Sequence, residues 1–219
     1  MTSTLLEMLP AAAAFALSPL GLVAMMLVLL SRNPRRNGLV FLAALLVPVF
    51  GVTCLSALRT DAADASGAGM PTTQAWVVLV VAAVLAVGAV HSFVHRRDPT
   101  PPAFFARVEG MGPAAMVLVA PIESVVNPKN LVVLLGAGSI AGRSGHPPSQ
   151  LVVLTAAFTV VATLPFLALI GYMAVGGARA ASDVARWKEW LLRYNRWTMA
   201  VLLAAIAVVL AVPAVAALR

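Results

Sequence analysis

Residues 123–130 read ESVVNPKN and place two charges, two asparagines and a proline inside an otherwise apolar run near residues 113–141. A charge at the centre of a membrane-spanning helix costs about 2.5–3.5 kcal/mol on insertion scales, so Glu123 and Lys129 need compensation within the protein. Six residues turn a regular helix through about 240°, and the two side chains could therefore pair only across a break at Pro128. This stretch predicts a helix that is interrupted in mid-membrane.

The rest of the sequence has the composition of a membrane protein. Of its 219 residues, 61% are hydrophobic and 11% are charged, whereas a soluble domain carries about 25% charged residues. Apolar runs bounded by charge, proline or glycine predict six transmembrane helices, near residues 5–30, 37–58, 75–95, 113–141, 149–176 and 197–218. The expected fold is an all-α integral membrane protein. An enzyme is not expected, because no nucleophile with a neighbouring base is visible.

Basic residues alternate between the two sides of this predicted bundle. Eleven of the 15 follow the first, third and fifth helices: Arg32, Arg35, Arg36, Arg96, Arg97, Arg107, Arg179, Arg186, Lys188, Arg193 and Arg196. Because Lys and Arg stay in cytoplasmic loops, both termini are expected outside the cytoplasm. Topology thus explains the net charge of +7, and nucleic-acid binding is not expected. Residues 182–197 predict a cytoplasmic amphipathic helix that anchors the protein in the headgroup layer or gathers anionic lipid.

The two halves of the chain, residues 1–98 and 99–219, resemble each other. Three pairs of residues align at offsets of 109, 117 and 121: Pro19 with Pro128, Pro48 with Pro165, and Trp76 with Trp197. Each half holds three predicted spans, an odd number, so the second half enters the membrane in the opposite sense. Inverted repeats of this kind are typical of alternating-access transporters.

Four prolines lie near the middle of predicted spans. Proline removes a backbone donor and frees carbonyl groups that lipid cannot satisfy. For Pro48 and Pro165 we expect simple kinks. For Ser18–Pro19 and Asn127–Pro128, where polar side chains accompany the prolines, we expect functional breaks. Broken helices point their positive ends toward anions and their carbonyl ends toward cations in a wet cavity.

Three interactions are open to Lys129. It could pair with Glu123 across the broken turn, cap freed carbonyls of the first helix, or face an anionic group of a substrate. We also hypothesise that Glu123 changes its protonation during transport. No catalytic residue, cofactor or metal site is expected. The predicted substrate-binding residues are those of the two breaks: Ser18, Pro19, Glu123, Asn127, Pro128, Lys129 and Asn130.

Small residues elsewhere in the spans predict helix packing. Thr53, Cys54 and Ser56 form a strip of small polar side chains on the second predicted helix. Gly138 and Gly142 form a small-xxx-small pattern on the fourth. Both patterns are typical of close contacts between helices in membranes.

Several of these motifs resemble one family. They are Leu17-Ser18-Pro19-Leu20 before an apolar run, SRNPRRNG at residues 31–38, and Asn127-Pro128-Lys129-Asn130-Leu131 followed by Gly-Ala-Gly. In helix number and order the whole chain is similar to the GAP, or sulfolipid-addressing, branch of the lysine-exporter (LysE) superfamily, and Asn-Pro-Lys-Asn is the most specific element. The resemblance implies an actinobacterial inner (plasma) membrane protein that helps to carry cell-envelope glycolipids, beside a larger lipid exporter.

A lipid exporter or flippase is therefore the leading prediction, since a lipid headgroup needs a polar midplane. The alternatives are an exporter of small solutes, such as amino acids or cations, and a non-transporting scaffold for an envelope-lipid exporter. Thiol-electron transfer, another activity in the superfamily, is excluded because it needs paired cysteines and the chain has one, Cys54. The expected partners are membrane lipids, an anionic envelope glycolipid as substrate and a larger lipid exporter. The oligomeric state is left open, with a homodimer as one option.

Overall fold

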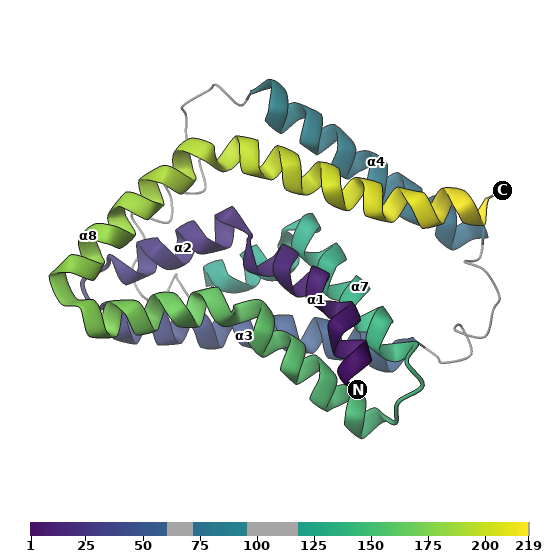
Figure 1. The fold of residues 1–219 in the computed structure, drawn as a ribbon, viewed down its shortest axis with the longest axis horizontal. Helices are drawn as coiled ribbons and strands as arrows, with labels where there is room; N and C mark the ends of the chain where they lie inside the picture. The colour runs from purple at the N-terminus through teal and green to yellow at the C-terminus, as the bar shows by residue number, and fades with distance from the viewer. Residues whose placement is uncertain (61–71, 96–117, 219) are drawn as a thin grey trace. The chain divides into compact units, whose positions relative to one another are not determined.

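The computed structural model describes residues 1–60, 72–95 and 118–218, and all regular elements in these ranges are helices (Figure 1). They are α1 (Thr2–Ala16), α2 (Pro19–Leu29), α3 (Pro34–Arg59), α4 (Thr72–Val94), the π-helix η2 (Ile122–Val126), α7 (Pro128–Gly142) and α8 (Pro148–Ala217). A helical turn at residues 118–121 leads into η2. Outside the described residues lie the start of the predicted fourth span and the basic residues Arg96, Arg97 and Arg107.

By length and composition these helices fit a multi-pass membrane protein. Three are long and apolar enough to cross a bilayer: Pro34–Arg59, Pro148–Tyr194 and Arg196–Ala216. Two further candidates are pairs of helices bent by 58° and 69°: Thr2–Ala16 with Pro19–Leu29, and Leu118–Val126 with Pro128–Gly142. The apolar helix Val78–Val94, within the predicted third span, is shorter. The all-α membrane class is confirmed, as are the interruptions at Pro19 and Pro128, and the count of six spans stays a prediction.

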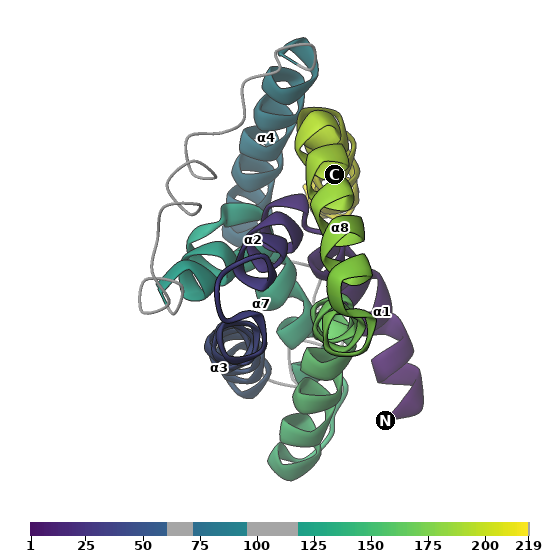
Figure 2. The same ribbon diagram turned by 90° about the vertical axis from the view of Figure 1, so that its left-hand side faces the viewer.

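The chain divides into two compact units. The first contains α1, α2, α3, η2, α7 and α8 up to Leu192, and the second contains α4 and α8 from Arg193. In the second unit α4 runs alongside the C-terminal part of α8 (Figures 1 and 2). The buried core of that unit is formed by Leu85, Ala89, Leu203 and Ala207. The predicted site residues all belong to the first unit.

Within the first unit, α7 packs against both α3 and α1. Two glycines allow α7 to approach α3 closely. A Cβ on Gly138 would lie 2.4 Å from the carbonyl oxygen of Thr53, and one on Gly142 would lie 2.6 Å from the α3 backbone. Ser56 Oγ donates a hydrogen bond of 2.8 Å to the Leu135 carbonyl across the same contact. The predicted packing role is confirmed for these glycines and for Thr53 and Ser56 on α3.

Pro48 and Pro165 behave differently from Pro19 and Pro128. Both lie inside helices that continue on either side of them, α3 and α8. Shortly after Pro48, Thr53 Oγ1 donates a hydrogen bond of 2.8 Å to the Val49 carbonyl of the same helix. These two prolines remain within single helices, as expected for kinks.

α8 changes direction at Gly177, whose φ of 53° and ψ of −135° are not helical. Two contacts made by Tyr172 bridge this turn. Its hydroxyl donates a hydrogen bond of 2.5 Å to Asp183 Oδ2, and its ring stacks on Trp187 with ring centroids 5.3 Å apart. The residues after Gly177 are helical, as predicted for 182–197, and Trp187 is half-exposed. Two side-chain contacts of Tyr172 thus join the segments of α8 on either side of Gly177.

We expect Gly177→Ala to lower the free energy of unfolding by about 1–2 kcal/mol, because a residue with a Cβ is strained at this positive φ. Gly171→Ala is the matched control, since it lies in the same helix and its Cβ would meet nothing within 4 Å. Thermal unfolding of both purified variants in one detergent measures the difference. Equal unfolding temperatures would show that the backbone at Gly177 is not held in this conformation.

Candidate functional site

The first break follows from the sequence Ser18–Pro19. α1 ends at Ala16, and Ser18 takes an extended conformation with φ −65° and ψ 110°, which is the region favoured by a residue that precedes proline. The Ser18 N–H bonds to the Phe15 carbonyl at 3.0 Å and therefore no longer serves the Ala14 carbonyl four residues back. The break leaves Ala14 O without a backbone donor, at the negative end of α1.

The second break, at Asn127–Pro128, has nearly the same geometry. Asn127 has φ −67° and ψ 112°, and Pro128 occupies the first position of α7. The preceding segment is a π-helix, in which the Asn127 N–H bonds to the Ile122 carbonyl at 3.2 Å. The next donor in that pattern would be residue 128, and proline has no N–H. The carbonyl of Glu123 is therefore also left without a backbone donor, here because the residue that would supply it is proline.

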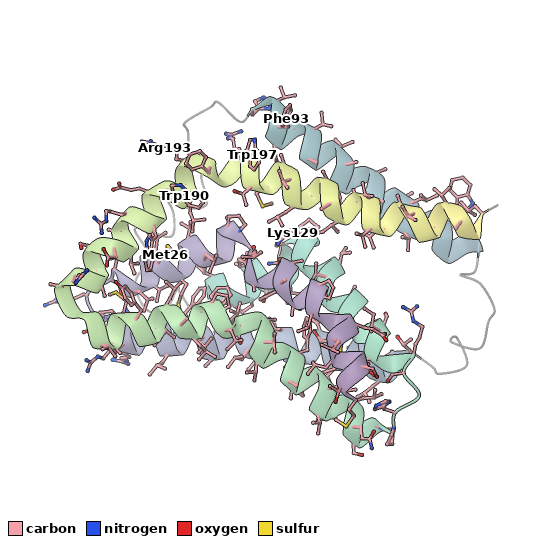
Figure 3. All side chains as sticks on the ribbon, in the orientation of Figure 1. Met26, Phe93, Lys129, Trp190, Arg193 and Trp197 are labelled. Carbon is pink, nitrogen blue, oxygen red and sulfur yellow. The ribbon has the colours of Figure 1, made fainter. Side chains whose placement is uncertain are left out.

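Two side chains at the start of α7 bind the freed carbonyls. Lys129 Nζ donates a hydrogen bond of 3.0 Å to Ala14 O, and Figure 3 labels Lys129 beside the C-terminal end of α1. Asn130 Nδ2 donates a hydrogen bond of 3.0 Å to the carbonyl oxygen of Glu123. Each break thus leaves one carbonyl without a backbone donor, and a side chain of α7 donates a hydrogen bond to each of these carbonyls.

The Glu123 side chain binds the opposite end of the first break. Its Oε1 accepts hydrogen bonds of 2.8 Å from both Ser18 Oγ and Asn130 Nδ2. Its carboxyl group also lies against the first turn of α2, where a Cβ on Gly21 would be 3.0 Å from both Cδ and Oε2. The first turn of a helix carries free N–H groups and the positive end of the helix dipole. Glu123 therefore places its carboxyl group at the N-terminal end of α2, where its charge is opposite to that end of the helix dipole.

The two charges are compensated by the ends of the broken first helix. No ion pair joins Glu123 to Lys129, both of which are described, although each attracts the other electrostatically at longer range. Of the three interactions predicted for Lys129, the structure has the second, in which it caps a freed carbonyl of the first helix. The negative side chain binds the positive end of α2, and the positive side chain binds the negative end of α1.

Four of the seven predicted site residues form one buried group, which we call the polar break cluster: Ser18, Glu123, Lys129 and Asn130. Each of the four is at most 1% exposed. Pro19 and Pro128 shape the two breaks, and Asn127 Oδ1 caps α7 by accepting the Lys129 N–H at 3.2 Å. The structure therefore brings all seven predicted residues to one place, and their contact with a substrate stays a prediction.

Two buried acceptor atoms of the polar break cluster have no hydrogen-bond partner among the described residues. They are Glu123 Oε2 and Asn130 Oδ1. Lys129 Nζ has three donor positions, of which the Ala14 carbonyl takes one. The hydrogen bonds within the cluster therefore leave two acceptor atoms, and donor positions on Lys129 Nζ, that a bound molecule could use. In the described part of the chain, no group of three His, Cys, Asp or Glu side chains could hold a metal ion.

A stripe of buried threonines on α8 was not predicted from the sequence. Thr155, Thr159 and Thr163 are at most 4% exposed, and each hydroxyl bonds to the carbonyl four residues earlier in its own helix, at 2.7–2.9 Å. Their spacing of four residues is the signal that could have identified one helix face. Because their hydroxyls are satisfied locally, we interpret the stripe as a packing surface.

One of three comparisons with known proteins found a match. A family model described as Sap, sulfolipid-1-addressing protein, matches residues 8–216 of the chain. No curated protein and no solved structure matches the chain.

Proposed function

Because the chain belongs to the Sap, sulfolipid-1-addressing protein, family, we propose that it is a transporter or flippase that carries anionic cell-envelope glycolipids across the inner (plasma) membrane. The observation that carries the proposal is the polar break cluster. Two spans are broken at matching positions. Glu123 and Lys129, both buried, bind the two ends of the first break, and Asn127 and Asn130 bind those of the second. Buried charges at interrupted helices mark transport pathways in many membrane proteins.

We further propose that the chain forms six spans arranged as two inverted repeats, residues 1–98 and 99–219. Ser18 and Asn127 have the same backbone conformation within 2°, and each precedes a proline that begins a helix. The helices that follow the breaks also end alike. Ser31 Oγ donates to the Val28 carbonyl after α2, and Ser144 Oγ donates to the Ala141 carbonyl after α7. These parallels support two copies of one three-helix design.

The composition of the two units also supports the repeat. The first unit holds the first and second helical segments of each half, and the second unit holds the third segment of each half. Such a division is what a two-fold relation between the halves would produce. Three spans in each half would place the two copies in opposite senses, and the excess of basic residues in alternate loops would place both termini outside the cytoplasm.

In this proposal the headgroup of the lipid binds at the polar break cluster. Lys129 would turn its free donor positions to the anionic headgroup, and Ser18 and Asn130 would donate hydrogen bonds to the same headgroup. Because the four side chains are buried in the present conformation, the two breaks must open toward lipid for the headgroup to enter. Pro19, Asn127 and Pro128 would act as the joints of that opening, since they interrupt the backbone bonds that would otherwise resist it.

The proposal is tested by reconstituting the purified protein into vesicles with a fluorescent sulfated glycolipid, and following its movement between leaflets by quenching. The wild-type protein should accelerate the movement over protein-free vesicles. Loss of a hydrogen bond to a charged group costs about 1.5–3 kcal/mol, so Lys129→Gln should slow it about ten- to a hundredfold. Arg143→Gln is the matched control, because Arg143 is exposed beyond the end of α7 and loses the same charge.

Three results would contradict the carrier role. Lipid movement equal to that in empty vesicles would exclude flipping by the protein alone. Movement that appears only when a larger lipid exporter is added would favour the scaffold alternative. Accumulation of a labelled amino acid or cation without lipid movement would favour the small-solute exporter.

A further inference from the structure

The Glu123 carboxylate lies in a site that is built to bind an anion. Ser18 Oγ and Asn130 Nδ2 both donate to it at 2.8 Å. The first turn of α2 faces it, and because Pro19 has no N–H, the free backbone donors of that turn belong to Leu20 and Gly21. A Cβ on Gly21 would lie 3.0 Å from both Cδ and Oε2 of Glu123, so the carboxyl group lies close to this turn. We call these donors, from Ser18, residues 20–21 and Asn130, the anion seat.

Glu123 does not use this seat fully. Its side chain is 1% exposed, yet Oε2 has no partner among the described residues, although it lies against the position where a Cβ of Gly21 would be. The residue comes from η2, a π-helical segment, and π-helical turns occur frequently at functional sites. The carboxylate in the anion seat thus belongs to a π-helical segment, and one of its two oxygens has no partner among the described residues.

We infer that the anion seat is the binding site for a tetrahedral oxyanion, a sulfate or phosphate ester, and that Glu123 occupies it in place of that group until the ligand replaces it. The inference deepens the proposed function, on which it rests for the lipid that would carry the oxyanion. Such an ester has the same sign of charge as the carboxylate and offers more acceptor oxygens to the donors of the seat. The absent side chain of Gly21 leaves room for either occupant.

The test removes the internal occupant. In purified full-length Glu123→Ala, added sodium sulfate should bind in the emptied seat and raise the unfolding temperature. A ligand at ten times its dissociation constant should raise it by about 3–6 °C in a protein of this size. Sodium chloride at equal ionic strength is the reference, because sulfate also stabilises proteins non-specifically by exclusion from their surface. The wild-type protein should show only that non-specific effect.

Two variants serve as matched controls. Glu123→Gln keeps a side chain of the same size in the seat, so its unfolding temperature should not respond specifically to sulfate. Glu123→Ala combined with Gly21→Val refills the emptied space from α2, and the specific response should disappear. A parallel arm replaces sulfate by a single-chain sulfated lipid in neutral detergent, with an uncharged lipid of the same chain length as its reference.

A specific response to free sulfate and to the sulfated lipid supports an oxyanion seat that accepts either source. A response to the sulfated lipid alone supports a seat for the headgroup of a lipid. Recovery of folded Glu123→Ala only when sulfate is present during purification also supports the inference. If Glu123→Ala is not recovered in either condition, Glu123→Ser is compared in the same way. The inference is overturned if sulfate raises the unfolding temperature equally in all variants, or if neither variant shows anion-dependent recovery. This experiment measures anion binding and not transport. The binding inference can therefore fail while lipid movement is observed, and anion binding can be observed in a protein that moves no lipid.

Discussion

Lys129→Met is expected to lower the free energy of unfolding by about 3–5 kcal/mol, the cost of removing one partner from a buried set of charges. Lys129 Nζ is the donor that binds the Ala14 carbonyl, and without it that buried acceptor is left unsatisfied at a break where no backbone group can replace it. The same substitution removes the positive charge that attracts Glu123. Both losses fall on one buried group, so the effect should far exceed that of a surface substitution.

Chemical unfolding in detergent, with Arg143→Met as the control, measures this cost. Arg143 loses the same charge at an exposed position, and its substitution should change the unfolding free energy by less than about 0.5 kcal/mol. Similar losses for the two variants would mean that Lys129 is not held against the end of α1 in the membrane-embedded protein.

The double variant Lys129→Met, Glu123→Gln separates the two contributions. If the opposite charges support each other, the double variant should be more stable than the sum of the single losses by about 0.5–3 kcal/mol. Gln can still accept from Ser18 and Asn130, which keeps the hydrogen bonds of the carboxyl position. Additive losses would mean that each charge interacts only with its own helix end.

This arrangement explains how two charges are tolerated in an apolar span. A direct ion pair would compensate them only with each other and would leave the broken ends of the first helix unsatisfied. Here the chain uses each charge to satisfy an end of opposite polarity, Glu123 on α2 and Lys129 on α1. The charges and the break therefore stabilise each other across more than 100 residues of sequence, which links the two proposed repeats.

The positions of the breaks could be predicted from the sequence, because the effect of proline on its own backbone is local. Pro19 and Pro128 each follow a polar residue that the proline holds in an extended conformation, and both interruptions are found in the structure. The partner of Lys129 could not be predicted in the same way. Ala14 is 115 residues away, and the sequence allowed pairing with Glu123 equally well.

Other features depended on three-dimensional packing and left a weak signal in the sequence. Nothing in residues 122–126 distinguishes a π-helix from an α-helix, although Pro128 explains which carbonyl is freed. The threonine stripe on α8 has regular spacing, but threonine alone does not indicate whether a helix face is buried. The glycines of α7 predicted a close contact with another helix, but the sequence did not indicate that this helix is α3. In each case the missing information is a contact distant in sequence.

Gly138→Ala is expected to destabilise the protein by about 3 kcal/mol, at the upper end of the usual cost of overpacking. The new Cβ would lie 2.4 Å from the Thr53 carbonyl oxygen and 2.5 Å from Ser56 Cβ, so the α3 and α7 backbones would have to separate. The effect should also reach the site, because α7 carries Lys129 and Asn130 at its other end. We therefore expect slower lipid movement in the vesicle assay as well as a lower unfolding temperature.

Gly136→Ala provides the opposite result on the same helix. A Cβ at Gly136 would meet nothing within 4 Å, so this variant should gain about 0.5–1 kcal/mol from the higher helix propensity of alanine. Thermal unfolding of the two variants in one detergent should thus move in opposite directions. If both stabilise the protein, α7 does not pack against α3 through Gly138, and the position of the polar break cluster would no longer follow from that contact.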